Sequence, residues 1–261
     1  MDKVSFSNGR EGAYVLGAFI DALTWDQAVE RLADWGARRD SRYVCICNVH
    51  SVVTGSQDPG FMEVLNDADM ATADGTPVAW SLKAAGYHDQ QRINGPDLMW
   101  KYLAVAEQRG QTVFFYGSTD RTLELLRQSM LRSFPRLKIG GMISPPFREL
   151  SAEEDQASVD QINASGAAVV FVGLGCPKQE QWMAAHRGRI QGVMVGVGAA
   201  FDYHAGTIKR APRWMQDSGL EWFHRLMSEP RRLAKRYFVT NSLFVWKTAS
   251  AWARAGWALT H

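Results

Sequence analysis

Two short apolar runs lead directly into side chains that could do acid–base or hydrogen-bond chemistry. The run Tyr43–Cys47 leads into Asn48, whose amide can donate and accept hydrogen bonds with a sugar or a base. The run Met70–Ala73 leads into Asp74 and Gly75. A carboxylate in a partly dry cleft can have its pKa raised towards the range of a general base. Asn48 and Asp74 are therefore candidate catalytic residues, and a turn or helix-cap role is the alternative for each.

Arg92 is a candidate for holding a phosphate group. It stands just before residues 94–97, which read NGPD and favour the start of a helix. A guanidinium can form two parallel hydrogen bonds with a phosphate. An exposed surface arginine is the alternative.

A glycine-rich segment, GLGCPKQE at residues 173–180, follows the apolar run Ala168–Val172. Its glycines let the backbone approach a ligand, and the next helix start presents free N–H groups to an anion. The third glycine of the dinucleotide fingerprint is missing, and so is the G-x-x-x-x-G-K-S/T pattern of a P-loop. The segment is therefore a candidate diphosphate or nucleotide site, with the candidate residues Gly173, Gly175, Pro177, Lys178 and Gln179.

Asp202 follows the apolar run Val193–Val197 and could bind a ribose or sugar hydroxyl, with a structural cap as the alternative. Beyond it the chain becomes basic. From Lys209 to Arg254 there are ten Lys and Arg residues and three acids. A basic end on a near-neutral chain indicates an anionic partner such as a phosphate, a lipid headgroup or a nucleic acid.

The basic end also carries many aromatic residues. Arg225, Arg232 and Arg236 are spaced by seven and four positions, so a continuous helix would place them on one face. Aromatic and aliphatic residues interleave with them: Trp222, Phe223, Leu226, Leu233, Tyr237 and Phe238. This combination is typical of helices at a bilayer interface, and a solvated face over a packed helix is the alternative.

Apolar runs that alternate with amphipathic segments predict a mainly parallel α/β sheet flanked by helices. Ser151 and Glu154 form a capping box, and Pro177 suits a first helical turn. We expect an α/β core over residues 1–208 and a helical appendage over 209–261. The predicted helices are 96–109, 119–132, 151–165 and 177–189. The predicted strands are Tyr43–Cys47, Met70–Ala73, Thr112–Tyr116, Leu137–Met142, Ala168–Val172 and Val193–Val197.

The composition is that of an ordinary globular chain. Of its 261 residues 46% are apolar and 21% charged, with a net charge of +2. Three cysteines, an odd number without metal-ligand spacing, indicate a reducing compartment. The start of the chain has no signal-peptide pattern, and no run of roughly 18 apolar residues could span a bilayer. We expect a cytoplasmic protein, soluble or peripheral to the membrane.

Eight segments, taken in order, resemble the WecG/TagA/CpsF family of bacterial glycosyltransferases over roughly residues 14–238. The ordered series is specific, although each segment alone is weak. The segments are NVHS at 48–51, ADG at 73–75, RINGPDL at 92–98, GLGCPKQE at 173–180, GVGAAFD at 196–202, KRAP at 209–212, LEWFHRL at 220–226 and EPRR at 229–232.

The resemblance implies a Rossmann-like, inverting enzyme that uses neither a metal nor another cofactor. Such enzymes move a sugar from a UDP-sugar to a polyprenyl-diphosphate-linked sugar in cell-wall or exopolysaccharide synthesis. The sequence of residues 92–97, RINGPD, is similar to that of family members that add a hexose, so glucose is the expected sugar. N-acetylmannosamine and its uronic acid are the alternatives.

The resemblance also implies residue roles. The family's catalytic aspartate matches Asp74, and its active-site asparagine, arginine and glutamine match Asn48, Arg92 and Gln179. Arg225 and Arg232, with Arg236 as a looser match, correspond to arginines of an appendage that closes the site and contacts an anionic membrane. The chain departs from the family pattern twice, with Ile46 where a threonine is common and Lys235 where an arginine is expected.

Two other classes compete with this interpretation. A nicotinamide-dependent oxidoreductase needs a complete glycine fingerprint, which is missing. A non-catalytic nucleotide- or RNA-binding protein would show salt-sensitive nucleic-acid affinity and would not need Asp74. We expect no nucleic-acid partner, and a homo-oligomer coupled to membrane contact is a further hypothesis.

Overall fold

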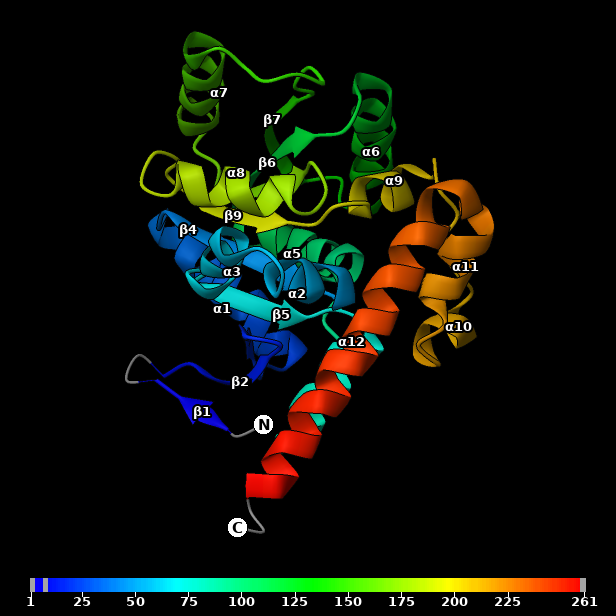
Figure 1. Ribbon diagram of the computed structural model, residues 1–261. Coiled ribbons are helices and arrows are strands. Elements are labelled where there is room, and N and C mark those ends of the chain that lie inside the picture. The colour runs from blue at the N-terminus through cyan, green and yellow to red at the C-terminus, as the bar shows by residue number, and fades with distance from the viewer. Residues whose placement is uncertain (1–2, 7–8, 259–261) are drawn as a thin grey trace.

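A parallel sheet forms the centre of the molecule (Figure 1). The computed structural model describes the backbone of residues 3–6 and 9–258, with side chains except at 217, 232, 235, 236 and 251–258. The sheet has six strands in the order β5-β4-β9-β8-β6-β7, which confirms the predicted α/β class. Each predicted run corresponds to one strand: β4 (Arg42–Cys47), β5 (Met70–Ala73), β6 (Thr112–Gly117), β7 (Lys138–Ile143), β8 (Val169–Gly173) and β9 (Val193–Gly196).

Side chains on both faces of this sheet are buried. In β4, Cys45 and Cys47 join one apolar cluster and Val44 and Ile46 the other, as the alternation of a strand requires. Helices cover each face and give a three-layer, Rossmann-like arrangement. The Cys45 face packs on α2 (Val49–Gly55), α3 (Pro59–Asn66), α4 (Thr76–Ala84), α7 (Ala152–Ala164) and α8 (Lys178–His186). The Val44 face packs on α1 (Trp25–Arg38), α5 (Gly95–Arg109), α6 (Asp120–Ser133) and α9 (Ala200–Ala205).

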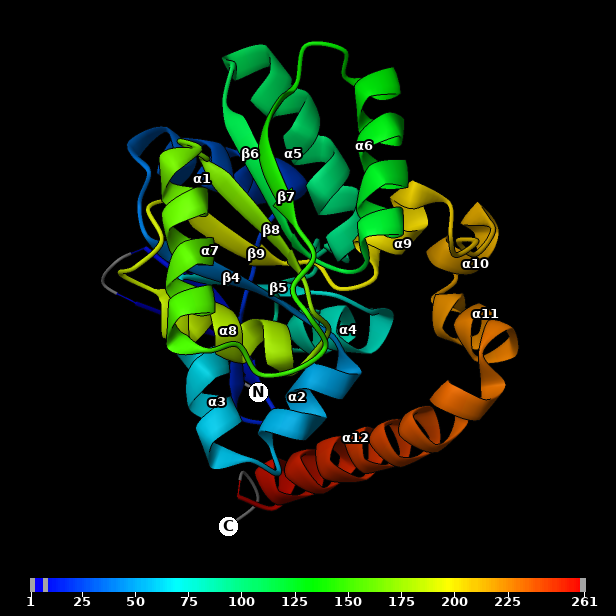
Figure 2. The ribbon, with the colours of Figure 1, turned by 90° about the horizontal axis from the view of Figure 1, so that it is seen from above.

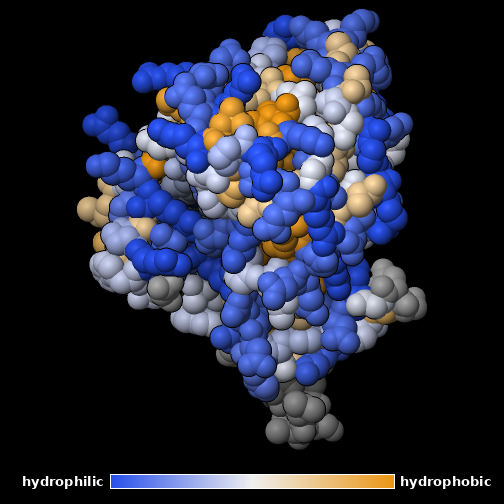
Figure 3. All heavy atoms as spheres, turned by 180° about the vertical axis from the view of Figure 1, so that it is seen from behind, coloured by the Kyte–Doolittle hydropathy of each residue, from blue (hydrophilic) through white to orange (hydrophobic). Residues whose placement is uncertain are grey.

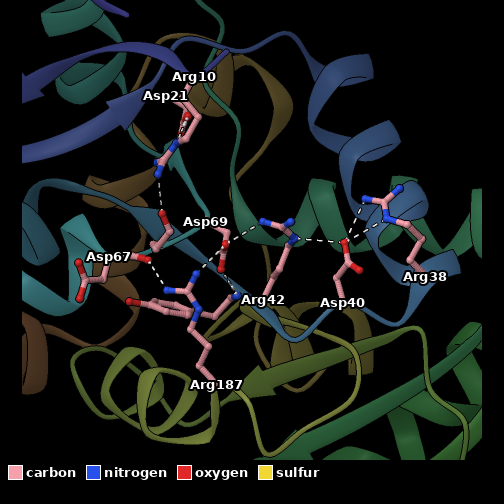
Figure 4. Close-up of polar contacts among 10 residues, drawn as sticks. Arg10, Asp21, Arg38, Asp40, Arg42, Asp67, Asp69 and Arg187 are labelled. Carbon is pink, nitrogen blue, oxygen red and sulfur yellow. Dashed lines mark hydrogen bonds and ion pairs between the residues drawn. The ribbon is translucent and has the colours of Figure 1, made fainter. Parts of the chain in front are cut away.

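A small antiparallel sheet precedes this core and was not predicted from the sequence. It consists of β1 (Val4–Ser5), β2 (Glu11–Val15) and β3 (Ala18–Asp21). Asp21 is fully buried, and both of its carboxylate oxygens accept hydrogen bonds from Arg10, at 2.9 and 2.8 Å. Its Oδ2 also accepts the N–H of Ala71 in β5, at 2.7 Å. This ion pair therefore ties the small sheet to the edge of the large one (Figure 4).

A second group of ion pairs lies at the amino ends of the strands. Asp69 precedes β5 and accepts hydrogen bonds from Arg42, the first residue of β4, and from Arg187, each at 3.0 Å. Arg42 also contacts Asp40 at 3.3 Å (Figure 4). These charges compensate one another at the edge opposite to the carboxyl ends, so they hold the strand ends together away from the candidate site.

Three helices follow the core: α10 (Arg213–Asp217), α11 (Glu221–Ser228) and α12 (Pro230–Ala258). They form an arm along one side of the core, and α12 runs beside α2 (Figures 1 and 2). Phe244 of α12 is buried there, and Lys247 donates a hydrogen bond to the Ser56 hydroxyl at 2.7 Å. Within the described part of the chain, no helix is both long and apolar enough to cross a bilayer.

The predicted single face of Arg225, Arg232 and Arg236 is wrong. Arg225 belongs to α11, which ends at Ser228, whereas the other two belong to α12. Proline cannot continue a preceding helix but suits a first turn, so Pro230 starts a new one. The side chains of Arg232 and Arg236 lie outside the described residues, so their predicted roles stay predictions.

Candidate active site at the carboxyl edge of the sheet

The candidate residues lie at the point where the order of the strands in the sheet reverses. From β4 the chain passes to β5 on one side, whereas β9 and the other strands lie on the other side of β4. Open parallel sheets bind ligands at the carboxyl ends of strands beside such a switch point. Asn48 follows β4, Asp74 follows β5, Gly175 follows β8 and Gly198 follows β9. The topology therefore brings four separate sequence segments to one edge.

Asn48 and Asp74 are neighbours across β4 and β5. The backbone N–H of Asp74 donates to the Cys47 carbonyl at 2.9 Å, and a Cβ on Gly75 would lie 3.9 Å from that of Asn48. Asn48 is the N-cap of α2 and its Oδ1 accepts the N–H of Ser51 at 3.2 Å, which confirms the cap alternative for this residue. The cap alternative for Asp74 is wrong, because Gly75 is the N-cap of α4.

Arg92 is held beside Asp74 rather than exposed on the surface. The N–H of Ile93 donates to the Ala73 carbonyl at 2.8 Å, so residues 92–93 run along the end of β5. The Nε of Arg92 donates to Oδ1 of Asp74 at 3.2 Å, and its Nη2 donates to Oε2 of Glu221. Burial disfavours the charge of Arg92, but the two carboxylates raise the pKa of Arg92 above its usual value. The guanidinium therefore remains charged at the centre of the site.

The carboxylate of Asp74 has the environment expected of a general base. Burial raises the pKa of Asp74, and this effect outweighs the opposing charge of Arg92. The side chain keeps 21% exposure, so solvent or a substrate can reach it. A carboxylate with a raised pKa binds a proton more readily, which is the property that proton abstraction requires.

Glu221, which begins α11, was not a candidate in the sequence analysis. Its carboxylate is buried between Arg92 and Arg210, with the Arg210 Nε at 3.6 Å from Oε1. Arg210 in turn donates two hydrogen bonds to Asp97, from Nη1 to Oδ1 at 2.5 Å and from Nη2 to Oδ2 at 2.8 Å. Despite the burial of Asp97, this pair and Asn94 lower the pKa of Asp97. Opposite charges therefore alternate from Asp74 through Arg92, Glu221 and Arg210 to Asp97.

Gln179 bridges two loops at this edge. Its buried Oε1 accepts the N–H of Gly175 at 3.2 Å and the N–H of Gly198 at 3.1 Å, and its Nε2 donates to Glu180 at 2.9 Å. The loop after β8 is thereby fixed to the loop after β9. Lys178, in contrast, is exposed on the first turn of α8.

The two glycines of the glycine-rich segment are required for different reasons. Gly175 has φ +82 and open space where a Cβ would be, so it permits a left-handed backbone next to free volume. A Cβ on Gly173 would lie 2.8 Å from the ring of Phe201, so its position is limited by packing. Open space beside Gly175 therefore suits the predicted close approach to a ligand, and for Gly173 that approach stays a prediction.

Three helices that start at this edge lack a side-chain cap. They are α4, α8 and α9, whose N-cap residues are Gly75, Pro177 and Ala199. The other helices of the α/β core are capped by the side chains of Thr24, Asn48, Asp58, Asn94, Thr119 and Ser151. Free N–H groups and the helix dipole favour an anion at such ends. The site can therefore receive negative charge at several backbone positions.

The remaining candidates lie around α9 and the arm. Asp202 accepts a hydrogen bond from the Thr207 hydroxyl at 3.0 Å, which favours the structural alternative for this residue. The guanidinium of Arg225 lies 5.7 Å from the centre of the Tyr203 ring. Ile46, in β4, is buried beside Gly95, so an apolar side chain fills the position where the family that the sequence resembles commonly has a threonine. No group of three or more His, Cys, Asp or Glu within the described residues is arranged to hold a metal ion.

The fold and this edge define a Rossmann-like α/β enzyme whose site combines a carboxylate with arginines and open helix ends. The chain belongs to the glycosyl transferase WecG/TagA/CpsF family, whose model matches residues 13–257. It is therefore a glycosyltransferase, as the resemblance predicted. The family match also disfavours the oxidoreductase and the non-catalytic binding protein as alternatives.

Two relatives carry the same name, N-acetylglucosaminyldiphosphoundecaprenol N-acetyl-beta-D-mannosaminyltransferase. The protein from Bacillus spizizenii is 35% identical over 177 residues, which cover 67% of each chain. A protein from Staphylococcus aureus is 28% identical over 240 residues, which cover 91% of this chain and 92% of the relative. The similarity to the second extends over nearly the whole of both chains.

Proposed function

We propose that this enzyme moves a sugar from a UDP-sugar to a sugar carried on a polyprenyl diphosphate, in the synthesis of a cell-wall or exopolysaccharide polymer. The names of the relatives support a lipid-linked acceptor whose sugar is N-acetylglucosamine. They also favour N-acetylmannosamine, the alternative in the sequence analysis, over glucose as the transferred sugar. The uronic acid of N-acetylmannosamine has no support from these names.

The contact between Arg92 and Asp74 is the observation that carries the proposed chemistry. Asp74 takes the proton of an acceptor hydroxyl, and the oxygen bonds to the anomeric carbon of the donor as the bond to UDP breaks. Attack from the face opposite UDP inverts the configuration of that carbon. The departing diphosphate gains negative charge, which arginines and uncapped helix ends can stabilise.

We assign supporting roles to the other candidates. Asn48 can orient the acceptor with the part of its amide that does not cap α2. Gln179 holds the loops of Gly175 and Gly198 against the donor. Positive charge for the diphosphate comes from Arg92 and from the arm, with the predicted contributors Lys178, Arg225, Arg232 and Arg236.

Residues 209–261 are proposed to act as an appendage that carries the site to an anionic membrane. On α12 the exposed apolar side chains Phe238 and Val245 are seven positions apart, and so are Val239 and Trp246, so they form one outward stripe. Trp214, Trp222, Phe223 and Met227 of α10 and α11 are also exposed. The back of the molecule is largely hydrophilic, with hydrophobic patches near its centre (Figure 3). The arm therefore suits the interface of the cytoplasmic membrane, and an associated oligomer remains a prediction.

A donor panel tests the proposed reaction. The full-length protein is mixed with UDP-N-acetylmannosamine, UDP-glucose or UDP-N-acetylglucosamine, a short-chain lipid diphosphate that carries N-acetylglucosamine, and EDTA. UDP release that needs both the acceptor and UDP-N-acetylmannosamine is the expected result. Release with UDP-glucose alone would restore glucose as the sugar. If every donor bound in calorimetry but none reacted with this acceptor, the assignment of the acceptor would be wrong.

A further inference from the structure

A buried glutamate from the arm lies next to the proposed base. Glu221 begins α11, and its carboxylate contacts Arg92, which lies between α4 and α5, and Arg210, which lies between α9 and α10. Carboxylates are rarely buried unless they are paired. The two arginines therefore make Glu221 the point at which the arm is tied electrostatically to the site.

Because of Glu221, the guanidinium of Arg92 contacts two different carboxylates. Nε goes to Asp74 and Nη2 goes to Glu221. An arginine that faces a single carboxylate often forms two parallel hydrogen bonds with it. Without Glu221, the freed Nη2 could turn towards Asp74 and neutralise that carboxylate more completely.

We propose that Glu221 is a positioning residue, which holds Arg92 so that Asp74 keeps only one hydrogen bond with it and remains available to take a proton. The inference rests on the proposed role of Asp74 as the base. It adds that Glu221, from residues 209–261, acts through Arg92 on the base Asp74, which belongs to residues 1–208.

The charges around Asp74 support this role. Arg92 faces it from the segment before α5, Glu221 and Arg225 face it from α11, and the buried thiol of Cys47 lies at the end of β4. Burial raises the pKa of Asp74 most, the two arginines lower it, and Glu221 raises it. Removal of the Glu221 charge therefore lowers the pKa of Asp74, and a carboxylate with a lower pKa is a weaker base.

The position of the arm then affects the proposed base through Glu221. The guanidinium of Arg210 anchors Glu221 and is itself held by Asp97 of α5, so α11 docks through a defined pair of arginines. Because Glu221 reaches Arg92 only when α11 is docked, the base is complete only in that arrangement. Proton transfer to Asp74 is thereby coupled to the position of the arm.

The test is the pH dependence of sugar transfer by the full-length Glu221→Gln variant, with the donor and acceptor from the panel above. We expect kcat to fall roughly tenfold, a part of the 10²–10⁴-fold that a general base contributes. The acid limb of the kcat profile should move to lower pH, because the pKa of Asp74 falls. The KM for the donor should change by less than about threefold, since ground-state binding is retained.

Two further variants separate positioning from structure. Arg210→Gln removes one of the two arginine contacts of Glu221 but keeps its carboxylate at Arg92, so its acid limb should match the wild type even if kcat falls. Glu221→Asp keeps the charge and should also retain the wild-type acid limb. If Glu221→Gln and Arg210→Gln lowered kcat alike with unmoved acid limbs, Glu221 would be structural only and the inference would be wrong.

Donor affinity provides an independent outcome. If Glu221→Gln bound the UDP-sugar more tightly in calorimetry and kept its kcat, Glu221 would merely occupy the place of the diphosphate at Arg92, and the inference would fail. A failure of the proposed function looks different. In that case the wild type would not transfer sugar, or it would transfer sugar equally well with asparagine at position 74.

Discussion

The Nε of Arg92 lies 3.2 Å from Oδ1 of Asp74, although the two residues belong to different segments of the chain. The hydrogen bond between Ile93 and Ala73 fixes this approach, because it holds the arginine's segment along β5. A cation and a candidate base are thus paired by backbone geometry at the carboxyl edge. For catalysis, the carboxylate of Asp74 must remain able to take a proton although it is paired with Arg92.

Asp74→Asn should abolish most of the transfer activity. Asparagine keeps the shape of the side chain but cannot take a proton, so kcat should fall by about 10²–10⁴-fold. The donor KM should change little, because the reacting proton belongs to the acceptor. Initial rates of UDP release, with thermal unfolding as the folding control, provide the measurement. Undiminished turnover would show that another group is the base.

The raised pKa of Asp74 also predicts the direction of two pH effects. Activity should fall as the pH drops through this pKa, which burial raises above the usual value of an aspartate. The stability contribution has the opposite direction. It is fully present below the unfolded-state pKa and is lost as pH rises through the folded-state pKa. Asp74→Asn should therefore lose less stability than the wild type between acidic and neutral pH, as thermal unfolding would measure.

Gln179→Ala should weaken both the fold and donor binding. The change leaves the N–H groups of Gly175 and Gly198 without their shared acceptor, at a cost of about 1–3 kcal/mol. Thermal unfolding and calorimetry with the donor would measure the two losses. Lys178→Ala is a matched control for stability, since that side chain is exposed and its loss should change the free energy of unfolding by less than about 0.5 kcal/mol. Equal stabilities of the two variants would contradict the bridging role of Gln179.

Gly175→Ala should lower donor affinity beyond the cost of its backbone strain. Alanine at φ +82 is strained by roughly 1–2 kcal/mol. Gly166 is a matched control, because it has φ +67 and equally open surroundings but lies away from the candidate site, between α7 and β8. Both alanine variants should lose similar stability, and only Gly175→Ala should bind the donor more weakly in calorimetry. Unchanged donor affinity would remove Gly175 from the ligand site.

Trp246→Glu should reduce binding to vesicles with anionic lipids while the fold is kept. Trp246 is 65% exposed on the outward stripe of α12, and a charge there opposes insertion into the interface. Phe147→Glu is the control, since Phe147 is 93% exposed but follows β7, outside the arm. Co-sedimentation with the vesicles measures the difference. Equal loss in both variants would indicate a charge effect unrelated to the arm.

Local patterns revealed the sheet well because each central strand is buried on both faces. The apolar run at β4 and the capping box at Ser151 are both confirmed, since they depend only on nearby residues. The small N-terminal sheet was missed because its strands are short and are stabilised by the distant contact of Arg10, Asp21 and Ala71. The helix α1 was also missed, although Thr24 and Gln27 form a capping box in the sequence.

The candidate site was predictable only in part. Residues that directly follow strands, such as Asn48 and Asp74, are brought together by the topology that the alternation of elements predicted. Glu221 lies in the segment LEWFHRL that resembles the family, but its contact with Arg92 spans 129 positions and could not be predicted from that segment. The roles of Gln179 and Gly173 likewise depend on loops and rings that meet only in the folded chain.

The order of the strands has a consequence for synthesis on the ribosome. Arg42 in β4 pairs with Val193 in β9, so one side of β4 stays unpaired until most of the chain has emerged. Pairings between distant segments form slowly and leave strand edges open in the meantime. The nascent chain therefore exposes the unpaired edge of β4 to chaperones, or to other chains, until β9 arrives.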